Sequence, residues 1–149
     1  MDQDMDNRVN KEIKMKSIAQ TVINNLQQPW AGQLQSGKHQ YFTDEPEEFG
    51  GCDTAPAPYD YLLASLAACT MITLRMYAKH KSTDYGNFQI VLNFYKNNDG
   101  KEWISRELHF KQDLDQLNQS KILNICQKTP VTKTLLRGIK IDTRIFIDQ

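Results

Sequence analysis

This chain of 149 residues has no excess of charge of either sign, no cluster of histidines and no long apolar run. Its 18 basic and 18 acidic side chains give a formal net charge of zero. No basic tract suggests nucleic acid, and no acidic tail suggests a basic partner. The three histidines are scattered, no metal-binding spacing is present, and no glycine loop has the pattern of a phosphate site. We therefore expect no metal, no cofactor and no nucleic acid.

Cysteine is also scarce, with only three residues at wide spacing: Cys52, Cys69 and Cys126. An odd number at such spacing argues against a secreted disulfide framework and against a C-x-x-C metal site. Residues 1–16 are polar and charged, without the apolar segment of a signal peptide. We expect a cytoplasmic protein with a flexible N-terminal segment over residues 1–16 and a single domain over residues 17–149.

The most apolar segment runs from Tyr61 to Leu74 and carries no charge. It is shorter than the roughly 18 apolar residues that a membrane-spanning helix needs. It also contains Ser65 and Thr70. We therefore expect a buried core helix and no membrane partner.

Hydrophobic periodicity and turn residues predict the order β-β-β-α-β-β-α-β. Hairpin turns are expected at Gly37 and at Asn98-Asp99-Gly100. The expected strands cover residues 18–23, 30–35, 39–43, 87–95, 103–111 and 138–147, and the expected helices cover residues 58–79 and 113–129. This order is typical of an α+β fold in which one antiparallel sheet of five or six strands packs on a long helix.

The long helix begins at Pro58, which suits a first helical turn, and Asp60 lies near the positive end of its dipole. Its residues are apolar around most of the circumference, and a single sheet covers only one side. Small residues such as Ala64 and Ala68 permit close approach of another backbone. We therefore predict a homodimer in which a second subunit covers the rest of the helix.

Cys69 lies near the middle of this helix, and two interpretations of it remain open. Free cysteine is a common buried residue, and the pattern alone favours a core position. A catalytic role requires a thiolate, which a nearby cation or helix N-terminus stabilises. Arg75 points to another face, and His80 lies about 16 Å further along the axis. Any activating group must therefore come from a loop, another strand or another subunit.

Two stretches, "DEPEEFGGCD" and "APAPYDYLLASLAACTMITLRMYA", followed by "TPVTKTL", resemble the OsmC/Ohr family, closest to its OsmC-like redox proteins. The resemblance covers roughly Gly37 to Ile147. It implies an OsmC-like α+β fold with a central cysteine-bearing helix, assembled as an intertwined homodimer. It also implies a thiol-dependent peroxidase that reduces organic hydroperoxides, with an external thiol or a lipoylated protein as the reductant. Cys69 matches the peroxidatic cysteine.

The family's other functional positions differ here. The resolving cysteine is replaced by Thr129, and the glutamate after the helix-opening proline is replaced by Tyr59, with an acid one place later as Asp60. No arginine occurs between Arg8 and Arg75, so the arginine usually supplied by the N-terminal strands has no match. The resemblance therefore implies a one-cysteine peroxidase or weak activity.

Cys126 has two interpretations, a displaced resolving thiol or a core residue, and its apolar stripe favours the core. Cys52, in a polar loop, reads as an incidental exposed thiol. We expect the substrate to contact Tyr59, Asp60, Leu66 and Thr129. The alternative function is a non-catalytic dimer of the same fold that binds an apolar small molecule, with Cys69 as a core residue.

Overall fold

The computed structural model describes residues 16–147, which form two compact units, one ending at Ala57 and the other beginning at Pro58. The single domain predicted over residues 17–149 stays a prediction. The flexible segment predicted over residues 1–16 lies outside the described residues except for Lys16.

The first unit is a three-stranded antiparallel sheet in the order β1-β2-β3. Gly37 joins the last two strands in a left-handed conformation with φ of 58°, as the predicted hairpin turn requires. A short 3₁₀ helix follows the sheet. The elements are β1 (Val22–Asn25), β2 (Gly32–Ser36), β3 (His39–Thr43) and η1 (Glu47–Phe49). The predicted strands over residues 30–35 and 39–43 are confirmed within about two residues, whereas the first strand begins four residues later than predicted.

One buried carboxylate organises the loop that leaves this sheet. Asp44 is 2% exposed and accepts hydrogen bonds from the backbone N–H groups of Glu45, Cys52 and Thr54 and from the Thr54 hydroxyl. The Thr54 hydroxyl and the Glu45 N–H lower the pKa of Asp44 by stabilising its charged form. The polar loop around Cys52 therefore has a defined conformation, and Cys52 is exposed on it.

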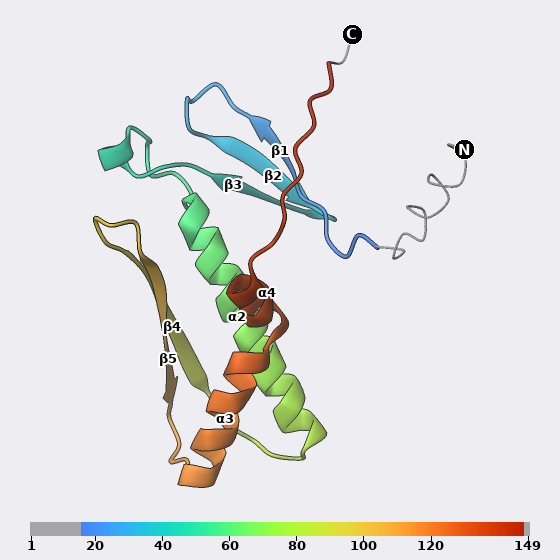
Figure 1. Ribbon diagram of the computed structural model, residues 1–149, viewed down its shortest axis with the longest axis vertical. Coiled ribbons are helices and arrows are strands. Elements are labelled where there is room, and N and C mark those ends of the chain that lie inside the picture. The colour runs from blue at the N-terminus through green and yellow to red at the C-terminus, as the bar shows by residue number, and fades with distance from the viewer. Residues whose placement is uncertain (1–15, 148–149) are drawn as a thin grey trace, which may run out of the picture. The chain divides into compact units, whose positions relative to one another are not determined.

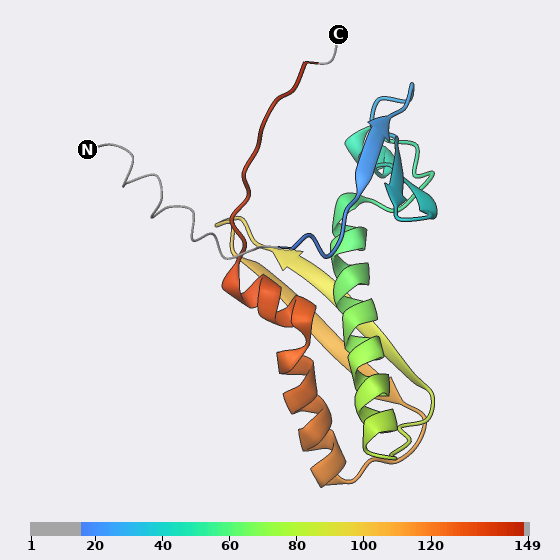
Figure 2. The ribbon, with the colours of Figure 1, turned by 90° about the vertical axis from the view of Figure 1, so that its right-hand side faces the viewer.

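The second unit packs three helices with a β-hairpin (Figures 1 and 2). Its elements are α2 (Pro58–His80), β4 (Phe88–Lys96), β5 (Glu102–Phe110), α3 (Gln116–Lys128) and α4 (Pro130–Arg137). The hairpin turn at Asn97–Lys101 is the predicted one. The long helix predicted over residues 58–79 is confirmed within one residue.

Within the part of the chain that the structure describes, the buried residues of α2 form one stripe at helical spacing: Leu66, Thr70, Leu74 and Ala78. Leu74 and Ala78 pack in the core with residues of α3. The other faces of α2 leave large apolar side chains exposed, among them Met71, Ile72 and Met76. By length and composition α2 could also cross a membrane, a criterion that core helices of water-soluble proteins satisfy too.

Three features differ from the sequence predictions. Pro130 ends α3 as expected, but it also opens a helix that was not predicted, α4, at whose first position a proline costs no hydrogen bond. Residues 138–147 alternate like a strand, yet they pair with nothing described and remain exposed, so the predicted last strand is wrong. The expected single sheet is instead one sheet of three strands and one of two. Strand pairing depends on a distant partner that local alternation does not specify.

Candidate functional site

The Cys69 thiol lies against the start of α4. The backbone N–H of Val131 donates to Cys69 Sγ at an N···S distance of 3.5 Å. Val131 is the second residue of α4, where backbone N–H groups have no acceptor within the helix. Cys69 itself is partly buried. The helix N-terminus therefore offers the thiol both a hydrogen-bond donor and the positive end of a dipole, which are surroundings typical of reactive cysteines.

A second network lies beside this contact and is centred on Arg106 of β5. Its Nη1 donates to Thr70 Oγ1 and to Thr132 Oγ1, each at 3.0 Å, and its Nη2 donates to the Cys126 carbonyl at 2.9 Å. Among residues 16–147, no carboxylate forms an ion pair with Arg106. The partly buried guanidinium is therefore satisfied by neutral oxygens from three helices.

The hydroxyls in this network have further partners. Thr70 Oγ1 donates to the Leu66 carbonyl at 2.7 Å, and Thr132 Oγ1 lies 2.7 Å from Thr129 Oγ1. Thr70 and Thr129 have no exposed surface, and Thr132 is 7% exposed. Buried hydroxyls with complete partners define one arrangement of their helices, because each lost bond leaves a polar group unsatisfied.

Cys126 lies in different surroundings, although its carbonyl belongs to the same network. Its side chain is 2% exposed and packs in the apolar core of the second unit, beside Leu74 and Ile122. Burial raises the pKa of the Cys126 thiol, and the nearby Arg106 charge offsets only part of that effect. All three cysteines are free thiols in the structure.

The predicted substrate contacts divide into two groups. Leu66 and Thr129 are linked to Thr70 and Thr132 by the hydrogen bonds just described, so they lie close to the Cys69 contact. Tyr59 and Asp60 are exposed in the first turn of α2, at least about 13 Å from Cys69 along the helix axis. The Tyr59 ring instead packs on Phe94, with ring centroids 4.5 Å apart.

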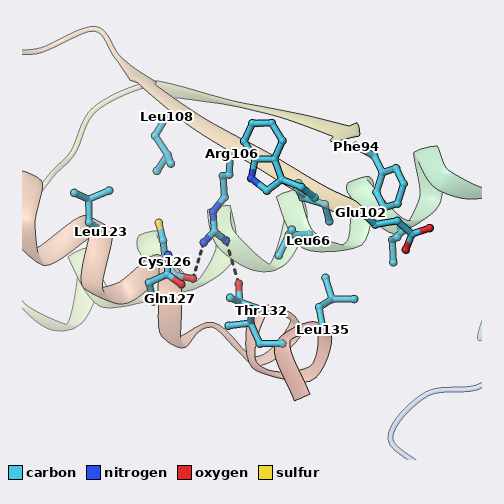
Figure 3. Close-up of a pocket in the computed structure, with 14 residues that line it drawn as sticks. Leu66, Phe94, Glu102, Arg106, Leu108, Leu123, Cys126, Gln127, Thr132 and Leu135 are labelled. Atoms are coloured by element: carbon cyan, nitrogen blue, oxygen red, sulfur yellow. Dashed lines mark hydrogen bonds between the residues drawn. The ribbon is translucent and has the colours of Figure 1, made fainter. Parts of the chain in front are cut away.

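A cavity of about 620 Å³ opens between the hairpin and the helices of the second unit (Figure 3). Its wall is mainly apolar, and Arg106 crosses it toward Cys126 and Thr132. Glu102 also borders it and forms an ion pair with Lys96 at 3.4 Å. The remaining lining residues are Leu62, Leu66, Phe94, Trp103, Ile104, Leu108, Leu123, Gln127, Leu135 and Leu136. Cys69 is not part of this wall. Within the described range, no group of acidic, histidine and cysteine side chains could hold a metal ion.

The sequence predicts Thr129 as a site residue but does not identify Arg106, Val131, Thr70 or Thr132. One signal for Arg106 is present in the sequence. On β5 it alternates in phase with Ile104, Leu108 and Phe110, all partly buried, so it is a charged residue on the apolar face of a strand. A cation in such a position requires buried acceptors, and the structure supplies three.

Comparison with known proteins agrees with this architecture. The family described as OsmC-like protein matches residues 50–144. No curated protein matches the chain.

Three solved structures share the fold. An organic hydroperoxide resistance protein OsmC from Legionella pneumophila has 17% identity and a TM-score of 0.61, with 84% of this chain and 93% of that chain covered. The OsmC-like protein from Mycoplasma pneumoniae has 18% identity and a TM-score of 0.61, with 85% and 91% covered. The organic hydroperoxide resistance protein OhrB of Bacillus subtilis has 22% identity and a TM-score of 0.55, with 82% and 92% covered.

Proposed function

The chain belongs to the OsmC-like family, and from this premise we propose that it is a thiol-dependent peroxidase that reduces organic hydroperoxides through Cys69. The observation that carries the proposal is the Val131 N–H on the Cys69 sulfur, because it supplies the activating group that α2 itself lacks. The names of the relatives from Legionella pneumophila and Bacillus subtilis support the substrate class.

The first chemical step transfers one oxygen atom. The Cys69 thiolate attacks the terminal peroxide oxygen, an S–O bond forms, and the O–O bond breaks. The leaving alkoxide takes up a proton and departs as an alcohol, while Cys69 becomes a sulfenic acid. The sulfur is oxidised by two electrons and the peroxide is reduced by two. The N–H of Val131 holds the attacking sulfur in place before the step.

The second step requires an external thiol. Thr129 stands at the resolving position and cannot form a disulfide, and the Cys126 side chain is buried in the core. We propose that a low-molecular-weight thiol or a lipoylated protein attacks the sulfenic acid, forming a mixed disulfide and releasing water. A second thiol then releases Cys69 and leaves the reductant as a disulfide.

We also propose that the working form is a cytoplasmic homodimer. The support for the dimer is the apolar surface that α2 leaves exposed at Met71, Ile72 and Met76, together with the alternating segment over residues 138–147, which has no strand partner among the described residues. Exposed apolar side chains gathered on one helix are typical of a surface that another protein subunit covers. Light scattering at micromolar concentration should give about twice the chain mass of 17.3 kDa. A uniform monomer would contradict the dimer.

The peroxidase proposal is tested by trapping the sulfenic acid. Cumene hydroperoxide should convert Cys69 to a species that a dimedone probe captures, as mass spectrometry of the Cys69 peptide would show. Cys69→Ser should abolish capture, and Cys126→Ser should leave it unchanged or raise it. Cys52→Ser is the matched control at an exposed thiol. If the Cys69 peptide stays unmodified at a large excess of peroxide, the proposed peroxidase activity is wrong.

One observation favours the alternative, a non-catalytic dimer that binds an apolar small molecule. The apolar cavity described above does not include Cys69 in its wall, so it could hold a ligand without any thiol chemistry. A hydrophobic fluorescent probe should then bind the protein with the same affinity before and after alkylation of Cys69. Binding combined with an inert Cys69 would support this function over the peroxidase.

A further inference from the structure

We propose that Arg106 is a positioning residue for Cys69, and that its guanidinium holds the start of α4 so that the Val131 N–H remains on the sulfur. The inference rests on the thiol chemistry proposed above. Among the hydrogen bonds of residues 16–147, those of Arg106 go to Thr70, Thr132 and the Cys126 carbonyl and not to the sulfur, so its effect passes through the two threonines.

The two threonines are sequence neighbours of the thiol and of its hydrogen-bond donor. Thr70 directly follows Cys69 on α2, and Thr132 directly follows Val131 on α4. Both hydroxyls accept from the same nitrogen, Nη1 of Arg106, at 3.0 Å. The thiol and its donor are therefore each one residue away from a shared point of attachment, which limits how far the two helices can separate at this place.

The third hydrogen bond holds the junction between α3 and α4. Nη2 of Arg106 donates to the Cys126 carbonyl, which lies in the last turn of α3, three residues before Thr129 (Figure 3). Carbonyl groups in a last turn lack N–H donors within the helix, and a charged donor forms a strong bond to them. Arg106 thus binds the helix before the junction as well as the helix after it.

The geometry of the side chain explains why arginine occupies this position. A planar guanidinium directs donors from two terminal nitrogens along fixed directions, so it can hold three oxygens from three helices at once. A lysine ammonium keeps the charge but lacks the rigid fork. Arg106→Lys should therefore fail to preserve the arrangement even though it preserves the charge.

The test measures alkylation of Cys69 by iodoacetamide, without any peroxide, at pH 7 and at pH 10. The rate at pH 10, where most thiols are ionised, reports access, and the ratio of the two rates reports stabilisation of the thiolate. Arg106→Met and Arg106→Lys should each lower the ratio of the pH 7 rate to the pH 10 rate by about tenfold, the effect of weakening one hydrogen bond to a charged group. Peptide-resolved mass spectrometry separates Cys69 from Cys52.

Matched variants separate positioning from loss of charge and from loss of folding. Thr132→Val should lower the ratio as Arg106→Met does, and Thr132→Ser, which keeps the hydroxyl, should restore it. Arg75→Met removes one positive charge from the exposed side of α2 and should leave the ratio unchanged. If Arg106→Met does not fold, the Thr132 pair still decides the matter. A variant that only loosens packing would raise the rate at both pH values.

A spectroscopic readout addresses the contact itself. The amide proton of Val131 should shift when Cys69 is ionised in the wild type, and this shift should be lost in Thr132→Val but retained in Thr132→Ser. A wild-type rate ratio in folded Arg106→Met, or an equal ratio in the two Thr132 variants, would overturn the proposal. Peroxide could leave Cys69 unmodified while the ratios of the pH 7 to the pH 10 alkylation rates behave as expected. That result would contradict the proposed peroxidase activity and still support the positioning role of Arg106.

Discussion

Two thiols of the second unit, Cys69 and Cys126, adjoin one hydrogen-bond network in opposite surroundings. Cys69 is partly buried and receives a backbone N–H from the start of a helix. Cys126 has only 2% of its surface exposed and packs among apolar side chains, where burial raises its pKa. The difference shows that the surroundings of a cysteine, and not its presence in an apolar stripe, decide whether it is suited to nucleophilic chemistry.

The largest expected effect is a difference in alkylation. In the native protein Cys69 should react directly with iodoacetamide, whereas Cys126 should react only when the core opens. An opening free energy of about 5 kcal/mol corresponds to a difference of at least about a thousandfold in rate. Peptide-resolved mass spectrometry measures both sites in one sample, with the exposed Cys52 as the reference. Similar rates at Cys69 and Cys126 would contradict the contrast.

A count of free thiols tests whether Cys69 and Cys126 form a disulfide. Protein purified without reductant should show three free thiols, because all three cysteines are free in the structure and Cys126 is enclosed by core residues. The count is made with a thiol reagent in denaturant, and Cys52→Ser, which should give two, calibrates it. A count of one would indicate a bond between Cys69 and Cys126 and would restore a two-cysteine mechanism.

Serine substitutions at Cys126 and at Cys69 should change the free energy of unfolding by different amounts. Cys126→Ser places a hydroxyl in the apolar core and should lower the free energy of unfolding by about 1–3 kcal/mol. Cys69→Ser, at a partly exposed position, should cost less than about 1 kcal/mol. Urea unfolding followed by circular dichroism measures both. Cys126→Ala controls for lost packing without added polarity, and equal costs at the two sites would place Cys126 outside the core.

The smallest effect is a dependence of stability on alkaline pH. Because the pKa of Cys126 is raised in the folded chain, the unfolded chain loses this proton first as the pH rises. The contribution of the thiol to stability is therefore complete below about pH 8.5 and declines above it, by at most about 1.4 kcal/mol per pH unit. Cys126→Ala should flatten the decline in urea unfolding between pH 8 and pH 10. Burial raises the pKa of Tyr85 in the same direction, and the variant retains Tyr85. An identical decline in both proteins would show that Cys126 titrates normally.

Much of the fold could be predicted, because the signals involved are local. Pro58 and the uncharged run after it predict α2, and the turn residues near Gly100 predict the β4–β5 hairpin. From the sequence, Pro130 predicts only the end of a helix, although in the structure it also opens α4. The alternation over residues 138–147 predicted a strand, but a strand also needs a hydrogen-bonded neighbour, and the described residues provide none for it.

In the candidate site, too, the sequence predicted the features with local signals and missed those that depend on distant residues. The sequence singled out Cys69 and required that its activating group come from another element, because helix geometry fixes which neighbours a residue can reach within two or three turns. Only the tertiary structure decided that the N–H of Val131, 62 residues away, donates to the Cys69 sulfur, and that Arg106 joins Thr70 to Thr132 across 36 and 26 residues. Backbone geometry sets local periodicity, whereas contacts between distant residues depend on how the helices and the hairpin pack.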